Sequence, residues 1–231
     1  MQADQALEQT MQPPGSQAWI QRREWRSISR ALARVPSGAA VLDMPCGSGR
    51  WLEPLVKRAY RVTCADPDGA ALARAAGRWR ELAKAGKASS PQPTFVLGDL
   101  LQTGFPAHHF DAVVCTGFFD RLGTSDLRIE ALRELWRISR GPVVVSFCNA
   151  FALGALQLTV LSRRSSGRSQ RRIPVPVWAF LNDLRRAGLK PVARHAVLWG
   201  ISPLWHIVSV PDSRQADGLY AFPRTAVAKS A

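Results

Sequence analysis

The stretch VLDMPCGSGR, Val41 to Arg50, reads as a buried strand that ends in an acid and enters a glycine-rich turn. Small and branched apolar residues over 39–42 predict a buried parallel strand, and residues 51–59 predict a helix. Gly47 and Gly49 can adopt backbone angles closed to other residues and allow a ligand to approach the main chain. The helix, entered at Gly49, would direct free backbone amides into the same space. The stretch therefore predicts a ligand-binding turn; the competing interpretation is a strand-to-helix turn without a ligand.

Three more predicted strands end in an acid or a small residue, as the first one does. The carboxyl ends of strands in a doubly wound sheet meet at one edge, so these positions predict a single pocket. An acid at the tip of the second strand is suited to binding ribose hydroxyls. The strands and their terminal residues are 60–65 with Asp66, 94–97 with Asp99, and 110–115 with Cys115.

The rest of the chain predicts further helices and a closing pair of strands. Trp25, Ile28, Leu32 and Val35 recur at helical spacing, so the helix over 17–35 is expected to lie across the sheet or the cofactor face. The segment 84–93 predicts a loop. The remaining elements are helices over 127–139 and 177–187, a strand over 141–147, and two strands over 190–198 and 204–210 around a turn at 200–203.

Four segments, VLDMPCGSGR, VTCADPD, GDL and FDAVVC, resemble the sequential motifs of class I S-adenosylmethionine-dependent methyltransferases over about residues 38–148. RELWRISRGPVVVSF is similar to the matching segment of small-molecule enzymes related to the quinone-biosynthesis methyltransferases. Pro45 departs from the pattern, because the class commonly has the first glycine of its loop there. The resemblance implies an α/β, Rossmann-like, doubly wound, mostly parallel seven-stranded sheet with an antiparallel C-terminal hairpin. It also implies S-adenosyl-L-methionine as cofactor and methyl transfer to a small-molecule acceptor.

The same resemblance implies roles for individual residues. Asp43 would orient the loop and reach the methionine amino group, and Asp66 would bind the ribose hydroxyls. Asp99 would accept a hydrogen bond from the adenine amine; the alternative is a turn-forming or helix-capping acid. The other expected cofactor-binding residues are Pro45, Cys46, Gly47, Ser48, Gly49, Pro67, Leu100 and Cys115, with Cys115 or Thr116 bordering the transferable methyl group.

A general base is optional, because the sulfonium is already activated and the enzyme mainly has to align the acceptor. Candidate bases each have a loop or surface position as the alternative interpretation. They are His108, His109, Asp120, His195 and His206. Four cysteines without a CxxC pair predict buried reduced thiols and no metal site.

Length and composition predict one methyltransferase domain over 17–210. Its cofactor-binding half is expected over about 38–148, and a substrate-side insertion over about 149–176. Residues 1–16 are expected to be a mobile leader, and 211–231 a loosely ordered tail. The first residues have neither a basic start nor an apolar core, so the sequence predicts a cytoplasmic protein without a secretory signal.

An apolar run over 147–161 precedes five arginines between Arg163 and Arg172. One interpretation is a buried or pocket-roofing helix followed by a basic loop that adds solubility. The other is an apolar acceptor channel rimmed by arginines, which contacts a membrane surface or an anionic substrate.

Three other functions compete with methyl transfer to a small molecule. A nicotinamide dehydrogenase would need a third glycine after Gly49, and Trp51 and Leu52 follow Arg50 instead. The formal net charge of +14 suits nucleic acid, but no recognised nucleic-acid-binding motif accompanies it, so nucleic-acid methylation is disfavoured. A non-catalytic, methyltransferase-like binding or scaffolding protein remains open.

Overall fold

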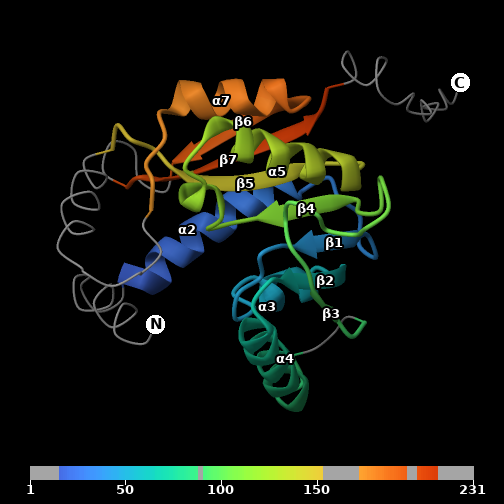
Figure 1. The fold of residues 1–231 in the computed structure, drawn as a ribbon. Coiled ribbons are helices and arrows are strands. Elements are labelled where there is room, and N and C mark those ends of the chain that lie inside the picture. The colour runs from blue at the N-terminus through green and yellow to red at the C-terminus, as the bar shows by residue number, and fades with distance from the viewer. Residues whose placement is uncertain (1–15, 88–90, 153–171, 197–201, 213–231) are drawn as a thin grey trace, which may run out of the picture.

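The computed structural model describes residues 16–87, 91–152, 172–196 and 202–212. In this part of the chain, seven strands form one sheet in the order β3-β2-β1-β4-β5-β7-β6 (Figure 1). The first five strands run parallel, and β7 runs antiparallel to both of its neighbours, β5 and β6. The expected mostly parallel sheet with a C-terminal hairpin is confirmed. The strands are β1 (Ala40–Asp43), β2 (Arg61–Asp66), β3 (Thr94–Leu97), β4 (Ala112–Cys115), β5 (Val143–Cys148), β6 (Leu189–Ala196) and β7 (Leu204–Pro211).

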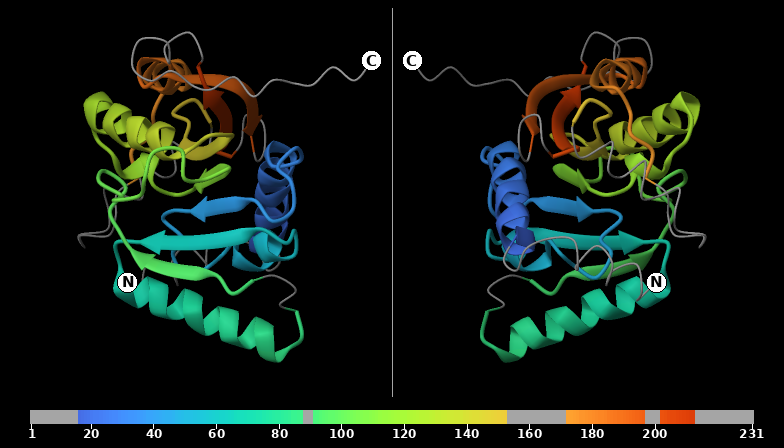
Figure 2. Two further views of the ribbon diagram at one scale, coloured as in Figure 1. Left: turned by 90° about the vertical axis from the view of Figure 1, so that its right-hand side faces the viewer. Right: turned by 90° about the vertical axis from the view of Figure 1, so that its left-hand side faces the viewer.

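Helices cover both faces of the sheet, so the central strands are buried on both sides. The runs AVVC of β4 and VVVSFC of β5 are buried at every residue, as expected for parallel strands between two helical layers. Figure 2 shows α2 on one face and α5 on the other. The helices are α2 (Ser16–Ala31), α3 (Leu52–Val56), α4 (Gly69–Lys84), the 3₁₀ turn η1 (Phe119–Arg121), α5 (Ser125–Ile138) and α7 (Val177–Arg186).

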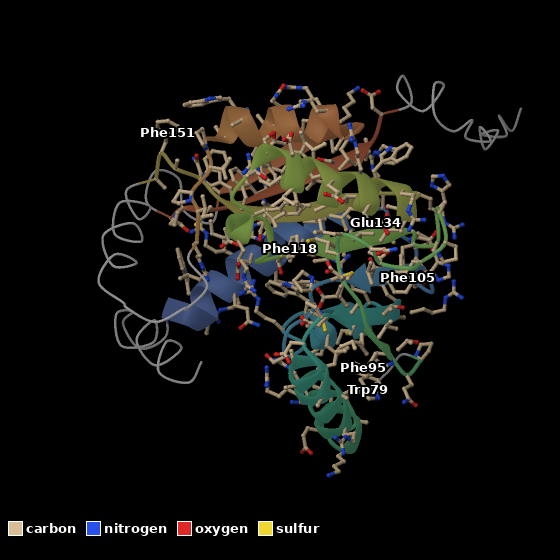
Figure 3. All side chains as sticks on the ribbon, in the orientation of Figure 1. Trp79, Phe95, Phe105, Phe118, Glu134 and Phe151 are labelled. Atoms are coloured by element: carbon tan, nitrogen blue, oxygen red, sulfur yellow. The ribbon has the colours of Figure 1, made fainter. Side chains whose placement is uncertain are left out.

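The two faces have separate hydrophobic cores. Ile28 of α2, Leu32 just after it and Trp51 pack with α3 and α4 against one face. On the other face α5 and α7 enclose an aromatic core, in which the rings of Phe147 and Phe180 stack with centroids 4.3 Å apart. In Figure 3, Trp79 of α4 and Phe95 of β3 lie close together below the centre of the sheet, where both contribute to the first core.

Several predicted element boundaries need correction. The helix expected over 51–59 and entered at Gly49 spans only Leu52–Val56, because Gly49 has a φ of 77° that no right-handed helix accepts. The amino-terminal helix ends at Ala31, although Leu32 continues to pack as the stripe predicted. Helix α4, which fills most of the segment before the predicted loop at 84–93, had not been predicted.

The apolar run expected over 147–161 does not begin as a helix, because Phe147 and Cys148 belong to β5 and pair with β7. The rest of the apolar run and four of the five arginines lie within 153–171, outside the described residues. The other ranges outside them are 1–15, 88–90, 197–201 and 213–231. Among the helices that the structure does describe, none is both long enough and apolar enough to cross a lipid bilayer.

Candidate cofactor site at the carboxyl edge of the sheet

The sheet reverses its strand order between β1 and β4, and the predicted turn lies there. Ligands of doubly wound sheets bind outside the carboxyl ends of the strands at such a switch point. The Met44 amide donates to the Val114 carbonyl and the Cys46 amide to the Ala65 carbonyl, each over 2.9 Å. The peptide bond between Met44 and Pro45 is cis. These contacts fix the start of the turn between β2 and β4.

The two glycines of the turn, Gly47 and Gly49, have different surroundings. Both have positive φ angles, 55° at Gly47 and 77° at Gly49, which other residues adopt with strain. A β-carbon on Gly47 would meet no atom within 4 Å, so its backbone faces open space. A β-carbon on Gly49 would lie 3.2 Å from the β-carbon of Ala75 in α4. Gly47 therefore leaves room for a ligand, whereas Gly49 allows α4 to pack against the turn.

Asp66, at the tip of β2, holds this turn in place. One carboxylate oxygen accepts the Gly47 amide over 2.8 Å, and the other accepts the Asp68 amide over 2.9 Å. A carboxylate oxygen can accept more than one hydrogen bond, so Asp66 retains acceptor capacity for a ligand. The residue expected to bind ribose thus also organises the backbone beside it.

Asp43, at the tip of β1, is fully buried, and neither of its carboxylate oxygens has a hydrogen-bond partner among the described residues. Burial raises the pKa of Asp43 to about 8, with the positive charge of Arg50 opposing the rise and the Asp66 carboxylate adding to it. A buried carboxyl without a partner is costly to a folded protein. It marks a place where a cationic, hydrogen-bonding group would be stabilised.

The tips of β2 and β3 present a mixed apolar and acidic surface. The expected adenine contact, Asp99, is exposed, and its Oδ1 accepts the Leu101 amide over 2.9 Å. This is the turn-forming alternative, and it leaves the second carboxylate oxygen for other partners. Pro67 is exposed and Leu100 is buried beneath the turn. Leu97 is 67% exposed at the end of β3, an apolar position that sequence patterning did not single out.

At the tip of β4, Cys115 is fully buried and Thr116 lies partly open. Burial raises the pKa of the Cys115 thiol well above its ordinary value, and the carboxylates of Asp43 and Asp120 add to the rise. The Trp51 indole nitrogen donates to the Thr116 hydroxyl over 2.9 Å. Trp51, which was predicted only as part of a helix, thereby connects the glycine turn to the end of β4.

The four cysteines are free and buried, in agreement with the expected reduced thiols. Burial raises the pKa of Cys148 to about 11, so this thiol stays protonated at neutral pH. Within the described ranges, no group of three His, Cys, Asp or Glu side chains is arranged to hold a metal ion.

The candidate bases are divided between the two ends of the sheet. His108 and His109 precede β4 at its amino end, where the His108 Nδ1 lies 3.2 Å from the Ser139 carbonyl oxygen. They are therefore distant from the turn along the strand direction. His195 of β6 and His206 of β7 are paired in register, and His206 is fully buried.

Asp120 lies in η1, just beyond β4, on the carboxyl side of the sheet. It is 3% exposed, its Oδ2 lies 3.4 Å from the Arg172 Nε, and its Oδ1 has no hydrogen-bond partner among the described residues. The negative charge of Asp120 contributes to the raised pKa of Cys148 at the tip of β5. Of the five candidate bases, Asp120 is the carboxylate that lies near the tips of both β4 and β5.

An aromatic pair adjoins this side of the sheet. The rings of Phe151 and Trp178 lie 4.6 Å apart, and both side chains are more than half exposed. Figure 3 shows Phe151 and Phe105 at opposite ends of the molecule, with Phe118 between them.

Comparison with known proteins agrees with this geometry. Residues 41–141 match the methyltransferase domain family. The chain is 37% identical over 120 residues to a demethylmenaquinone methyltransferase of Roseiflexus sp. (strain RS-1), a match that covers 51% of this chain and 45% of that protein. A second such enzyme, of Roseiflexus castenholzii (strain DSM 13941 / HLO8), is 35% identical over the same length. The chain thus spans about half the length of the curated relatives it matches.

Solved structures share the fold at low sequence identity. Magnesium protoporphyrin IX methyltransferase from Synechocystis PCC 6803, with bound SAH, superposes with a TM-score of 0.68 at 18% identity, covering 87% of this chain and 89% of that one. The same enzyme with bound SAM gives a TM-score of 0.63 at 16% identity, with coverage of 84% and 80%. Over residues 41–141 the chain is similar to the methyltransferase domain family, and its relatives include quinone-biosynthesis methyltransferases, in agreement with the expected class and cofactor. The expected fold is confirmed.

Proposed function

We propose that this protein transfers the methyl group of S-adenosylmethionine to a small-molecule acceptor. The observation that carries the proposal is the buried Asp43 carboxyl, which has no hydrogen-bond partner among the described residues and lies at the end of β1, just before the turn with open space at Gly47. The cofactor's ammonium group would give that carboxyl the cationic partner it lacks. The residues present therefore fit the cofactor.

The other contacts follow from the positions of the strand tips. Asp66 accepts hydrogen bonds from the ribose hydroxyls while it continues to hold the Gly47 amide. The second oxygen of Asp99 accepts a hydrogen bond from the adenine amine. Leu97, a large apolar side chain that is 67% exposed, would be covered by the adenine ring. Pro67 and Leu100 complete the ring contacts, and Pro45, Cys46, Ser48 and Gly49 form the turn.

The bound cofactor supplies a methyl group on a positively charged sulfur, so the protein needs to supply placement more than chemical activation. Cys115 and Thr116 border the methyl group at the tip of β4. The hydrogen bond from Trp51 to Thr116 orients the threonine hydroxyl. The protonated Cys115 thiol, with its raised pKa, does not compete as a nucleophile.

The acceptor site is proposed over the tips of β4 and β5, beside the cofactor. Asp120 offers an unpaired oxygen to an acceptor hydroxyl, and its other oxygen is held by Arg172. Phe151 and Trp178 offer an exposed aromatic surface. An apolar ring compound with a hydroxyl or acidic group fits this combination, and the quinone and porphyrin named for the relatives are compounds of that kind.

The test has a binding step and a transfer step. Calorimetric titration with SAH should show binding at micromolar concentration, and NADH should not bind. Methyl transfer from labelled S-adenosylmethionine is then measured with a demethylated naphthoquinol and with magnesium protoporphyrin. Failure to bind SAH would contradict the proposal. Binding without transfer to any acceptor offered would favour the non-catalytic alternative.

Two expectations stay predictions. Contact with an anionic substrate or a membrane surface through Arg163–Arg172 rests on a segment of which only Arg172 is described. A cytoplasmic location likewise stays a prediction of the sequence.

A further inference from the structure

Helix α2 lies outside residues 41–141, which match the methyltransferase domain family. One of its side chains, Glu24, nevertheless forms an ion pair with the residue that follows the glycine turn. The Glu24 carboxylate is 1% exposed, and its Oε1 lies 2.9 Å from the Arg50 Nη2. Arg50 follows directly after Gly49. A residue 26 positions earlier in the chain therefore forms an ion pair with the end of the turn that the cofactor would occupy.

Arg50 is held from a second side by an aromatic ring. Its guanidinium carbon lies 4.2 Å from the centroid of the Trp51 ring, within the range of a cation–π contact. Trp51 in turn stacks with Trp25 of α2, with centroids 6.1 Å apart, and donates to Thr116 at the tip of β4. Glu24 and the two tryptophans thus connect α2, the glycine turn and the methyl-transfer end of β4.

Stability alone gives a poor account of this ion pair. Burial raises the pKa of Glu24, and its Oε2 has no hydrogen-bond partner among the described residues. His206, with its Nε2 3.9 Å from Oε1, is neutral at physiological pH because burial lowers its pKa to about 3. Arg50 and, more weakly, Arg172 are the cations that act on Glu24. Desolvation of a buried carboxylate commonly offsets what one such pair contributes to folding.

We propose that Glu24 is a positioning residue for cofactor binding, acting through Arg50 to hold the Gly47–Gly49 turn in its binding conformation. The inference rests on the proposed function and adds α2 to the machinery of that site. The direction of the Arg50 side chain matters because its charge also acts on Asp43, the proposed partner of the cofactor's ammonium group. When Glu24 is neutralised, the 44% exposed Arg50 side chain is free to turn into solvent or toward Asp43.

The test compares SAH affinity with the stability of the unliganded protein. Glu24→Gln and Arg50→Met should each weaken SAH binding in calorimetry by about fivefold or more, as expected for a coupling between two sites. The double variant should bind no more weakly than the weaker single variant, because both changes break the same contact. The thermal midpoint of Glu24→Gln without ligand should stay level or rise, because the buried carboxylate is removed and the half-exposed Arg50 side chain stays hydrated. Arg50→Met should lower the midpoint, because it leaves the Glu24 carboxylate buried without its cation.

Ser29→Ala is the matched control. The Ser29 hydroxyl accepts a hydrogen bond from Arg58 over 2.5 Å, so it also joins α2 to the segment after β1, but away from the glycine turn. This variant should keep wild-type SAH affinity. Equal losses in Ser29→Ala and Glu24→Gln would overturn the proposal, as would unchanged affinity in Glu24→Gln. Additive losses in the double variant, or a lower unliganded midpoint of Glu24→Gln, would also overturn it. Absence of SAH binding by the wild type would instead refute the proposed function.

Discussion

At the level of single residues, Asp66 has two roles: it stabilises the backbone of the glycine turn, and it is proposed to bind the ribose hydroxyls. It accepts hydrogen bonds from the Gly47 and Asp68 amides. Asp66→Asn should weaken SAH binding about tenfold or more, because a charged acceptor of backbone amides is lost at the site. Calorimetric titration measures the loss.

Asp111→Asn provides the control for Asp66. Asp111 accepts the Ala40 amide over 2.8 Å, so it is also a carboxylate that binds backbone, but it does so at the amino end of β1. The Asp111 variant should lose stability and keep its SAH affinity. If both variants lost affinity equally, Asp66 would have no direct role in binding.

Asp43 predicts a pH dependence of stability in the unliganded protein. Its pKa is about 8 when folded and near 3.8 when unfolded, so between these values the folded state binds the extra proton. The free energy of unfolding contributed by Asp43 therefore falls as pH rises from about 4 to 8, and is constant above that range. Thermal unfolding from pH 5 to 9 should show this slope as the difference between wild type and Asp43→Asn. Identical slopes in the two proteins would contradict the assignment.

At the level of elements, a buried ion pair joins α5 to α7. The Arg128 Nε lies 2.7 Å from the Asp183 Oδ2, both side chains are almost fully buried, and Ser125 donates to the other oxygen of Asp183. Asp183→Asn should lower the free energy of unfolding by about 3 kcal/mol or more, because it leaves Arg128 buried without its anion. Denaturant unfolding measures the change.

The exposed pair of Lys84 and Glu81 on α4 is the comparison. Lys84→Gln should leave the midpoint of unfolding unchanged, because solvent screens exposed pairs. A loss in Asp183→Asn no larger than that in Lys84→Gln would mean that the two helices do not depend on the buried pair.

Helix α3 shows why a helix predicted from a local pattern can have the wrong bounds. The sequence predicts one helix over residues 51–59, but Gly49 has a positive φ and the helix begins only at Leu52. Ala59, with a φ of 58°, ends the segment. Gly49 also packs closely on α4, since a β-carbon there would lie 3.2 Å from the β-carbon of Ala75. Glycine at this position therefore suits both the positive φ and the contact with a helix distant in the sequence.

At the level of the whole molecule, the cysteines test the packing of the entire sheet. Cys46, Cys64, Cys115 and Cys148 are buried and free, and they lie on the turn and on three different strands. A thiol reagent such as dithionitrobenzoate should react with none of them in the native protein and with all four after denaturation. Burial excludes the reagent, and the raised pKa of Cys148 keeps little of it as reactive thiolate. Rapid reaction of any thiol in the native state would show an opening in this core.

The sequence by itself predicted the class of this protein, because the segments at the ends of the first four strands resemble the sequential motifs of class I S-adenosylmethionine-dependent methyltransferases. The apolar runs of the strands can be recognised from neighbouring residues alone. For that reason β3 was predicted at its observed bounds, and the bounds of the central strands were predicted within two residues. The order of the strands and the gathering of Asp43, Asp66, Asp99 and Cys115 at one edge followed from the class.

Only the tertiary structure shows the contacts between side chains that are distant in the sequence. The ion pair of Glu24 with Arg50, the hydrogen bond of Trp51 with Thr116, and the nearness of Asp120 to Arg172 join residues 26, 65 and 52 positions apart. No local pattern encodes such contacts, because they form only when helices pack on opposite ends and faces of a finished sheet. The separation of His108 from the carboxyl edge was decided in the same way, by the direction in which β4 runs.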